Sequence, residues 1–165
     1  MKLESLRDLF EESIQDLYSA ETQIIDAMPK IVARVTDSRL KQALESHVLE
    51  TQAQKERLEE ICEKLDIDPD GKFCRATEGL VKEANELLSE DAAPAVLDAG
   101  IIASVQKIEH YEIAGYGTAR VFAMHLGETE VQKLLEESLQ EEKQADVKLT
   151  VIAEGTVNEK AEGAS

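Results

Sequence analysis

The 165-residue chain is long enough for one domain with a sizeable hydrophobic core. It carries 35 acidic and 18 basic residues, and the resulting net charge of −17 repels nucleic acid and anionic membranes. Aromatic residues make up only 4% of the chain, so the core must be built mainly from Leu, Ile, Val and Ala, which favours helices packed on helices. No apolar run approaches the length of a membrane span, and we expect no membrane partner.

The first predicted helix covers residues 3–35. Its apolar residues recur at steps of three and four, the spacing of one helix face, but Glu21 interrupts the row between Leu17 and Ile24. Pro29 is expected to kink this helix, because proline removes a backbone donor and crowds the preceding turn.

The second predicted helix follows the Thr–Asp pair at 36–37, either of which can cap a helix, and runs to about residue 65. Its row is again apolar at both ends and polar in the middle. There His47, Glu50 and Gln54 share one side of the helix. Pro69 and Gly71 then break the helix, and a short helix is predicted at 77–88.

Two further long helices are predicted at 93–126 and 129–153. Gly115 and Gly117 lie inside the first of these, where they allow a neighbouring helix to come close or permit a local bulge. Residues 154–165 are small, polar and charged, and are predicted to form a flexible C-terminal tail.

This order of elements predicts an all-α four-helix bundle that occupies residues 1–153 as a single domain. The short links make two antiparallel hairpins. The long connection, with its short extra helix, lets the second and third long helices run parallel, which is the ferritin-like arrangement with one long crossover. A simple up-down-up-down bundle with a decorated loop is the alternative.

Each long helix carries an acidic residue near its middle, on the side predicted to face the core. Several buried carboxylates repel one another unless a cation meets them. Carboxylate and imidazole ligands suit iron or manganese, and a dinuclear site of this kind leaves positions open for dioxygen or peroxide. We predict two such ions per chain. The candidate metal ligands are Glu21, His47, Glu50, Glu109, Glu112, Glu142 and Asp146.

The five glutamates are the ligands of first choice, with His47 and Asp146 next. The usual Glu-x-x-His motif of ferritin-like sites is absent, because His47-x-x-Glu50 reverses it and the fourth long helix has no histidine. Gln54 is a candidate weak ligand or a hydrogen-bond donor to a ligand. Tyr18 and Tyr116 each lie one turn from a candidate glutamate, and a hydrogen bond to that carboxylate is the commoner role for a buried tyrosine.

Two cysteines, Cys62 and Cys74, are present, and we recognise no signal peptide. We therefore expect a cytoplasmic protein whose thiols are reduced, inert and partly buried. His110 and His125 lie off the buried row and are expected beside the site or at the surface.

Several segments are distinctive in combination. They are LYSAE at 17–21, HVLET at 47–51, EGL at 78–80, KIEHYEIA at 107–114 and EEK at 141–143. With these segments, nearly the whole chain except the tail resembles the YciF/YciE-type stress proteins, a bacterial branch of the ferritin-like, rubrerythrin-related superfamily. The resemblance implies a homodimer with a di-metal centre and a link to stress responses, but it supplies no reaction.

Two functions therefore stay open. The first is a non-haem dinuclear iron or manganese protein that reacts with dioxygen or peroxide in stress protection. The second is a metal-free helical dimer that serves as a structural or interaction stress protein, with its central acids met by protons, waters or basic residues such as Lys107 and Arg120. The sequence identifies no catalytic residue, so enzymatic activity is left open.

Overall fold

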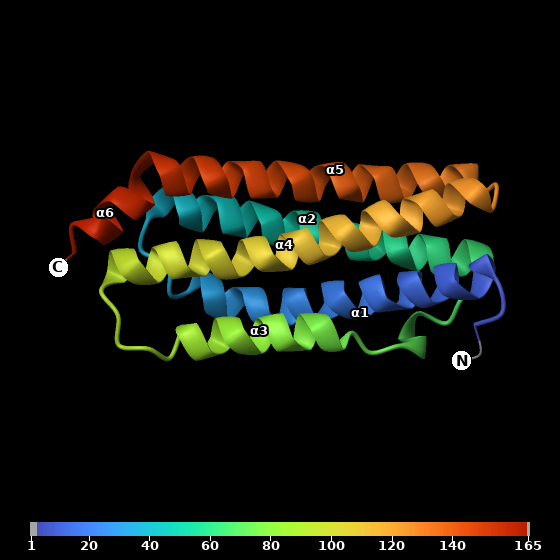
Figure 1. Cartoon of the computed structure of the whole chain (residues 1–165), viewed down its shortest axis with the longest axis horizontal. Helices are drawn as coiled ribbons and strands as arrows, with labels where there is room; N and C mark the ends of the chain where they lie inside the picture. Colours follow the sequence, from blue (N-terminus) through green and yellow to red (C-terminus); the bar gives the residue numbers. More distant parts are fainter. Residues whose placement is uncertain (1–2, 165) are drawn as a thin grey trace.

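The computed structural model describes residues 3–164 as an elongated bundle of helices (Figure 1). The four long helices are α1 (Leu6–Val32), α2 (Ser38–Leu65), α4 (Pro94–His125) and α5 (Thr129–Ile152). The connection from α2 to α4 carries the short 3-10 helix η1 (Pro69–Gly71) and the helix α3 (Arg75–Leu87). After α5 follow the π-helical turn η2 (Ala153–Val157) and α6 (Asn158–Glu162). Among the described residues there is no strand, and no helix is both long and apolar enough to span a membrane.

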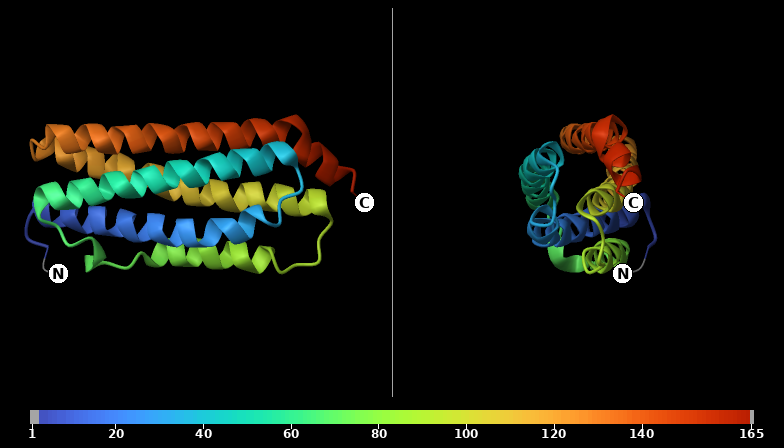
Figure 2. Two further views of the ribbon diagram at one scale, coloured as in Figure 1. Left: turned by 180° about the vertical axis from the view of Figure 1, so that it is seen from behind. Right: turned by 90° about the vertical axis from the view of Figure 1, so that its left-hand side faces the viewer.

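The helices α1 and α2 form one antiparallel hairpin, and α4 and α5 form the other (Figures 1 and 2). The α2–α4 connection returns along the bundle and carries α3 on the outside of α1 and α4, so α2 and α4 run in the same direction. This confirms the predicted all-α four-helix bundle with one long crossover and a short extra helix, the topology of ferritin-like folds. The simple up-down-up-down alternative is wrong.

Side-chain caps mark the starts of α1 and α2. Ser5 and Asp8 form a capping box at the start of α1, and the Asp37 carboxylate accepts two backbone N–H groups at the start of α2. The first helix stays helical through Pro29 and ends one turn later, at Val32. These caps fix where α1 and α2 begin, whereas α4 and α5 begin at Pro94 and Thr129 without a side-chain cap.

The hydrophobic core has two parts, one toward each end of the bundle. One contains Ile24 and Leu44 together with Leu149, and the other contains Leu17 and Leu58. Full burial of an aliphatic side chain of this size contributes about 1.5–3 kcal/mol relative to leaving it exposed. Polar side chains of the four long helices occupy the space between the two parts.

Gly115 brings α1 and α4 close together, as the sequence suggested. A Cβ at this position would lie 2.8 Å from Cδ2 of Leu17, a separation that real Cβ contacts do not show. The same atom on Gly117 would lie 4.0 Å from Leu139, an ordinary contact. Helix α4 passes through both glycines without a bulge.

The predicted flexible tail at 154–165 requires a correction. Helical turns continue from Ala153 to Glu162, and α6 packs against α4. The physical reason is Val157, which is 1% exposed and joins the core cluster of α4 and α5. The last residue, Ser165, lies outside the described residues.

Both cysteines are free and buried. Burial, followed by the charges of Asp68 and Glu59, raises the pKa of Cys62 to about 11, so this thiol stays protonated. The Sγ atom of Cys74 accepts a hydrogen bond from the Thr77 N–H and caps α3. The expected structural role of the thiols agrees with these surroundings.

Candidate metal centre

Side chains from all four long helices meet in one layer between the two parts of the core. The layer contains Glu21 of α1, His47 of α2, Glu109 and Glu112 of α4, and Glu142 of α5. The four glutamates are fully buried and His47 is 4% exposed. Acids from three helices and the imidazole of the fourth therefore converge, while the acid predicted from α2, Glu50, is not among the buried side chains.

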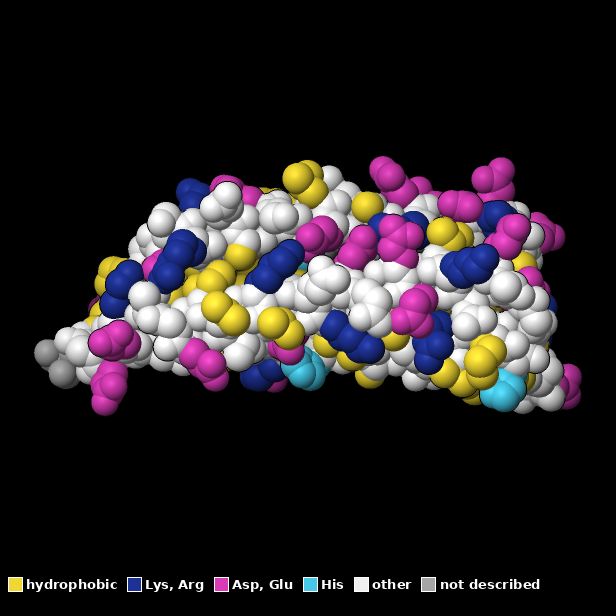
Figure 3. All heavy atoms as spheres, turned by 90° about the horizontal axis from the view of Figure 1, so that it is seen from above, with side chains coloured by type: hydrophobic (Ala, Val, Ile, Leu, Met, Phe, Trp, Pro, Cys, Tyr) yellow, Lys and Arg dark blue, Asp and Glu magenta, His cyan; other side chains and the backbone are white. Residues whose placement is uncertain are grey.

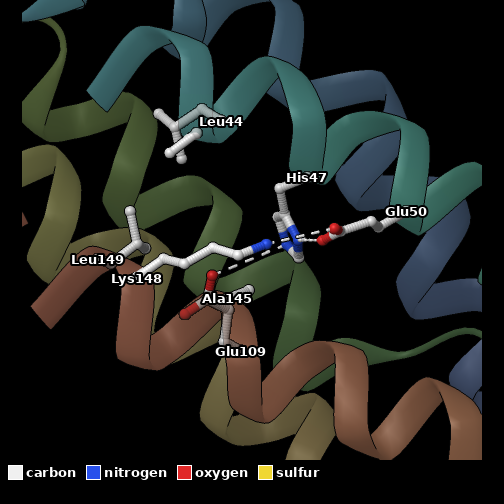
Figure 4. Close-up of a pocket in the computed structure, with 8 residues that line it drawn as sticks. Leu44, His47, Glu50, Glu109, Ala145, Lys148 and Leu149 are labelled. Carbon is white, nitrogen blue, oxygen red and sulfur yellow. Dashed lines mark hydrogen bonds and ion pairs between the residues drawn. The ribbon is translucent and has the colours of Figure 1, made fainter. Parts of the chain in front are cut away.

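The imidazole of His47 lies among the carboxylates. Its Nε2 is 3.9 Å from Oε1 of Glu109 and 4.0 Å from Oε2 of Glu142, while its Nδ1 is 3.7 Å from Oε2 of Glu50. Figure 4 shows His47 between Glu50 and Glu109. One ligand atom each from His47, Glu112 and Glu142 lie within 4.8 Å of one another, which is close enough for a shared cation.

Many polar atoms of this layer have no hydrogen-bond partner among the described residues. They include both ring nitrogens of His47, both carboxylate oxygens of Glu109 and of Glu112, and one oxygen each of Glu21 and Glu142. Buried polar atoms are normally satisfied, because burial without a partner is costly. Unpartnered donor atoms that converge on one small volume are what a bound cation would satisfy, so the residues fit a metal.

The electrostatics agree with a crowded acidic layer. Burial, and next the charge of Glu142, raise the pKa of Glu21 to about 8. Burial raises the pKa of Glu109 to about 8 although His47 opposes it, and burial with the charges of Glu142 and Glu21 raises that of Glu112 well above its ordinary value. Burial lowers the pKa of His47, but the surrounding carboxylates outweigh it and raise it to about 9. Without a metal, protons and the imidazolium carry the positive charge.

Gln54 is held in a chain of hydrogen bonds that ends on the layer. Its Nε2 donates to Oε1 of Glu142 at 2.6 Å and to Oε2 of Glu141 at 3.1 Å. Arg57 in turn binds both oxygens of Glu141 at 2.7 Å each. The structure thus places Gln54 as a donor that orients Glu142, one of its two predicted roles.

The two tyrosines differ. The buried hydroxyl of Tyr116 donates a hydrogen bond to Oε1 of Glu21, the role that the sequence favoured. The hydroxyl of Tyr18 instead donates to the surface residue Glu59 at 3.3 Å and takes no part in the layer.

Two predicted ligands lie away from the centre. Glu50 stands at the rim, 28% exposed, with Oε1 3.5 Å from Nζ of Lys148. Asp146 is 22% exposed, and its Oδ1 accepts from Nε2 of Gln106 at 2.9 Å and stands 3.6 Å from Nδ1 of the exposed His110. The structure therefore brings five of the seven candidates together, keeps Glu50 beside them and leaves Asp146 outside.

The basic residues expected to meet the central acids face elsewhere. Lys107 pairs with Glu83 at 3.3 Å, and Arg120 pairs with Glu136 at 3.1 Å. The cation that meets the acids is His47. The position of Lys148 at the rim could not be predicted from the sequence, because an exposed lysine on an acidic helix is ordinary.

Comparison with known proteins places the chain in a family. A family model described as "Domain of unknown function (DUF892)" matches residues 5–162. Protein YciF of Escherichia coli (strain K12) is 41% identical over 163 residues, which cover 98% of each chain. The crystal structure of the E. coli stress protein YciF matches with a TM-score of 0.90 and 40% identity, over 94% of this chain and 99% of that one.

Two other solved structures are similar. YcfI of Rhodopseudomonas palustris has a TM-score of 0.87 at 44% identity, over 90% of this chain and 95% of that one. A protein of Xanthomonas campestris pv. campestris has a TM-score of 0.71 at 25% identity, over 93% of both chains. The sequence and structural matches extend over nearly the whole chain. They confirm the predicted resemblance to the YciF-type stress proteins. The chain therefore belongs to the DUF892 family, the family of the stress protein YciF.

Proposed function

We propose that the chain holds two ions of iron or manganese in its mid-bundle layer and reacts with dioxygen or peroxide as a protection under stress. The donor chemistry supports this, because carboxylate oxygens and imidazole nitrogens suit these metals. The bundle supports it too, since paired metals are commonly held by inward-facing acids of four-helix bundles. The kinship with the stress protein YciF supports the protective role.

The layer supplies the ligands, and its surroundings hold them in place. When bound, the metal ions supply redox chemistry toward dioxygen or peroxide. Gln54 orients Glu142 and Tyr116 orients Glu21, while the two apolar parts of the core exclude water above and below. We assign no catalytic residue. The proposed ligands are Glu21, His47, Glu50, Glu109, Glu112 and Glu142.

Asp146 has a supporting place in this proposal. It is bound to Gln106 and lies outside the buried layer. Its charge raises the pKa of Glu109, and so acts on a proposed ligand from outside. We therefore rank Asp146 below the other six candidates.

One observation carries the proposal: buried, unpartnered donor atoms from α1, α2, α4 and α5 face one another across a few ångströms. A metal-free protein must neutralise them with protons, which is costly near neutral pH. A pair of divalent ions removes that cost in one step.

The test is metal analysis of the purified chain and of protein reconstituted with Fe²⁺ or Mn²⁺, with magnetic resonance to detect a coupled pair. We expect about two ions per chain and a raised melting temperature. The Glu112→Gln/Glu142→Gln double variant serves as the matched control and should lose the metal. Absence of bound metal, together with an unchanged melting temperature on metal addition, contradicts the proposal.

A structural role is the second candidate, because YcfI is described, provisionally, as a structural protein. In this case the protonated His47 and protons shared among the glutamates satisfy the layer without metal. Mutation of the layer would then change stability and pH dependence alone. The metal analysis above separates the two candidates.

We further propose that the chain is a homodimer in the cytoplasm. The dimer follows from the family resemblance, and two free, buried cysteines suit a reducing compartment. Light scattering coupled to size-exclusion chromatography should give twice the chain mass of 18.3 kDa. A mass equal to one chain argues against the dimer.

A further inference from the structure

The polar layer approaches the surface along a seam between α2 and α5. A cavity in this seam is lined by His47 and Glu109 on the inside and by Glu50 and Lys148 toward solvent (Figure 4). It has about 10 Å³ of space for the centre of a water molecule, close to the minimum that one water needs. Four other hollows on the described part of the chain have linings that include none of the seven candidate ligands.

Exposure to solvent rises step by step along the seam. The side chain of Glu109 is 1% exposed and that of His47 is 4% exposed. The side chain of Glu50 is 28% exposed, and that of Lys148 is 51% exposed. A path from solvent to the buried layer therefore passes Lys148 first and Glu50 second.

Lys148 spans the seam. It extends from α5 toward Glu50 of α2, where its Nζ lies 3.5 Å from Oε1, and Figure 4 shows its chain lying across the cavity in front of His47. An exposed lysine–glutamate pair is weak, and lysine turns about a flexible four-carbon stem. Thermal motion of an exposed side chain is therefore enough to break the contact and re-form it.

Outside the seam lies a wider groove rather than another packed element. Lys148 and Ala43 line both the inner cavity and this groove, which has a volume of about 490 Å³. Its other walls include Val147 and Val151, which are 60% and 64% exposed. Figure 3 shows apolar side chains gathered toward one end of this face, among lysine, arginine and acidic side chains. Solvent thus reaches Lys148 directly.

We propose that this seam is the entrance to the polar layer and that Lys148 is the residue that closes it. A water-sized solute or a divalent cation passes when the ammonium leaves Glu50. The identity of the cation rests on the function proposed above. The entrance itself concerns only how solvent reaches His47, so it can be tested on metal-free protein.

The first test measures exchange of the C2 hydrogen of His47 in heavy water by mass spectrometry. We expect Lys148→Ala to speed this exchange roughly 1.5- to fivefold, the range that loss of one weak ion pair allows. Lys148→Arg keeps the pair and should keep the wild-type rate. The exposed His110 and His125 are internal references, and Lys133→Ala makes the same charge change elsewhere on α5.

The second test follows uptake of Co²⁺ or Mn²⁺ by the metal-free protein and its removal by a chelator. Lys148→Ala should speed uptake and removal by a similar factor, so that the equilibrium affinity changes less than either rate. Melting curves identify a variant that is simply misfolded.

The outcomes separate the two proposals. Faster His47 exchange in Lys148→Ala, with no metal bound by any variant, supports the entrance and contradicts the metal function. Metal binding with unchanged exchange and unchanged uptake in Lys148→Ala keeps the metal function and overturns the entrance. Equal acceleration in Lys133→Ala also overturns it, because the effect would then be one of net charge.

Discussion

Glu112 is a residue on which burial and like charges act in the same direction. Burial, with the charges of Glu142 and Glu21, raises its pKa well above the ordinary value of 4.5. Above pH 4.5 the folded protein keeps a proton that the unfolded chain releases, so the free energy of unfolding falls as pH rises, by about 1.4 kcal/mol per pH unit.

Glutamine has the shape of the protonated acid and needs no proton. We therefore expect Glu112→Gln to stabilise the metal-free protein at pH 7.5 by about 1–4 kcal/mol and to change little at pH 4.5. Urea unfolding at the two pH values measures the difference. The exposed Glu137→Gln is the control, and an equal gain at both pH values contradicts the argument.

Gln54 is predicted to act through Glu142, since its Nε2 holds Oε1 of that carboxylate. Loss of such a supporting hydrogen bond typically weakens metal binding about 10- to 100-fold. We expect this from Gln54→Met, measured by competition with a coloured chelator. The exposed Gln52→Met is the matched control and should bind as wild type does.

The buried acids could be predicted from the sequence for a simple reason. Glu21 and Glu142 each interrupt a row of apolar residues, and such a row fixes which side of a helix faces inward. Periodicity does not predict where a side chain lies to within a few ångströms. It ranked Glu50 with Glu112 and placed Asp146 beside His47 as the next choice, whereas the rim contact of Glu50 with Lys148 and the bond of Asp146 to Gln106 depend on where α2, α4 and α5 meet.

At the scale of the helices, the approach of α1 to α4 depends on Gly115. Replacement by alanine adds helix propensity of about 1 kcal/mol but drives Cβ into Leu17, and overpacking costs about 1–3 kcal/mol. We expect Gly115→Ala to lower stability by about 1 kcal/mol.

Gly117→Ala makes the same change where space is available and should raise stability by a few tenths to 1 kcal/mol. Thermal melts at pH 6 compare them, and a stabilised Gly115→Ala refutes the close contact.

The C-terminal helical turns depend on Val157. This side chain is 1% exposed, so Val157→Ala removes buried methyl groups and should cost about 1–2 kcal/mol. The neighbouring exposed Glu159→Ala should stay within about 0.5 kcal/mol of wild type. Chemical denaturation measures both, and a neutral Val157→Ala would restore the original prediction of a loose tail.

The helical turns after Ala153 could not be predicted from the sequence. A helical row needs several apolar residues, and after Ala153 only Val157 remains strongly apolar. Its burial is decided by α4, which lies far away in the sequence. The long helices gave no such difficulty, since each repeats its row over many turns.

Over the whole molecule, we expect the layer to oppose the usual dependence of stability on pH. The folded-state pKa values of Glu21 and Glu109 are about 8 and that of His47 is about 9, all above their ordinary values of 4.5 and 6.5. Their stabilising contribution is full below those ordinary values and is lost as pH rises through 8 to 9. Glu50, whose pKa His47 lowers, acts oppositely and only at acidic pH.

We therefore expect the metal-free chain to melt at a higher temperature at pH 5.5 than at pH 8.5. Metal binding needs deprotonated ligands, so added Mn²⁺ should stabilise most at pH 8.5, by about 2.7 kcal/mol at a hundredfold excess over the dissociation constant. Scanning calorimetry at both pH values, with and without Mn²⁺, measures this. A metal-free protein that is most stable at pH 8.5 would show that groups outside the layer determine how stability depends on pH.

The topology of the bundle could be predicted because loop length alone limits it. Short links leave only antiparallel neighbours, and the long α2–α4 connection has the reach to return along the bundle. The crossover has a further consequence for folding kinetics. The α1–α2 hairpin carries the imidazole and Glu21, while the α4–α5 hairpin carries the remaining central acids. Neither hairpin assembles the layer alone: Glu109, Glu112 and Glu142 already repel one another within α4–α5, and docking of α1–α2 adds Glu21 together with the imidazole that offsets these charges. We therefore expect the supply of protons or cations to affect the step in which the hairpins dock.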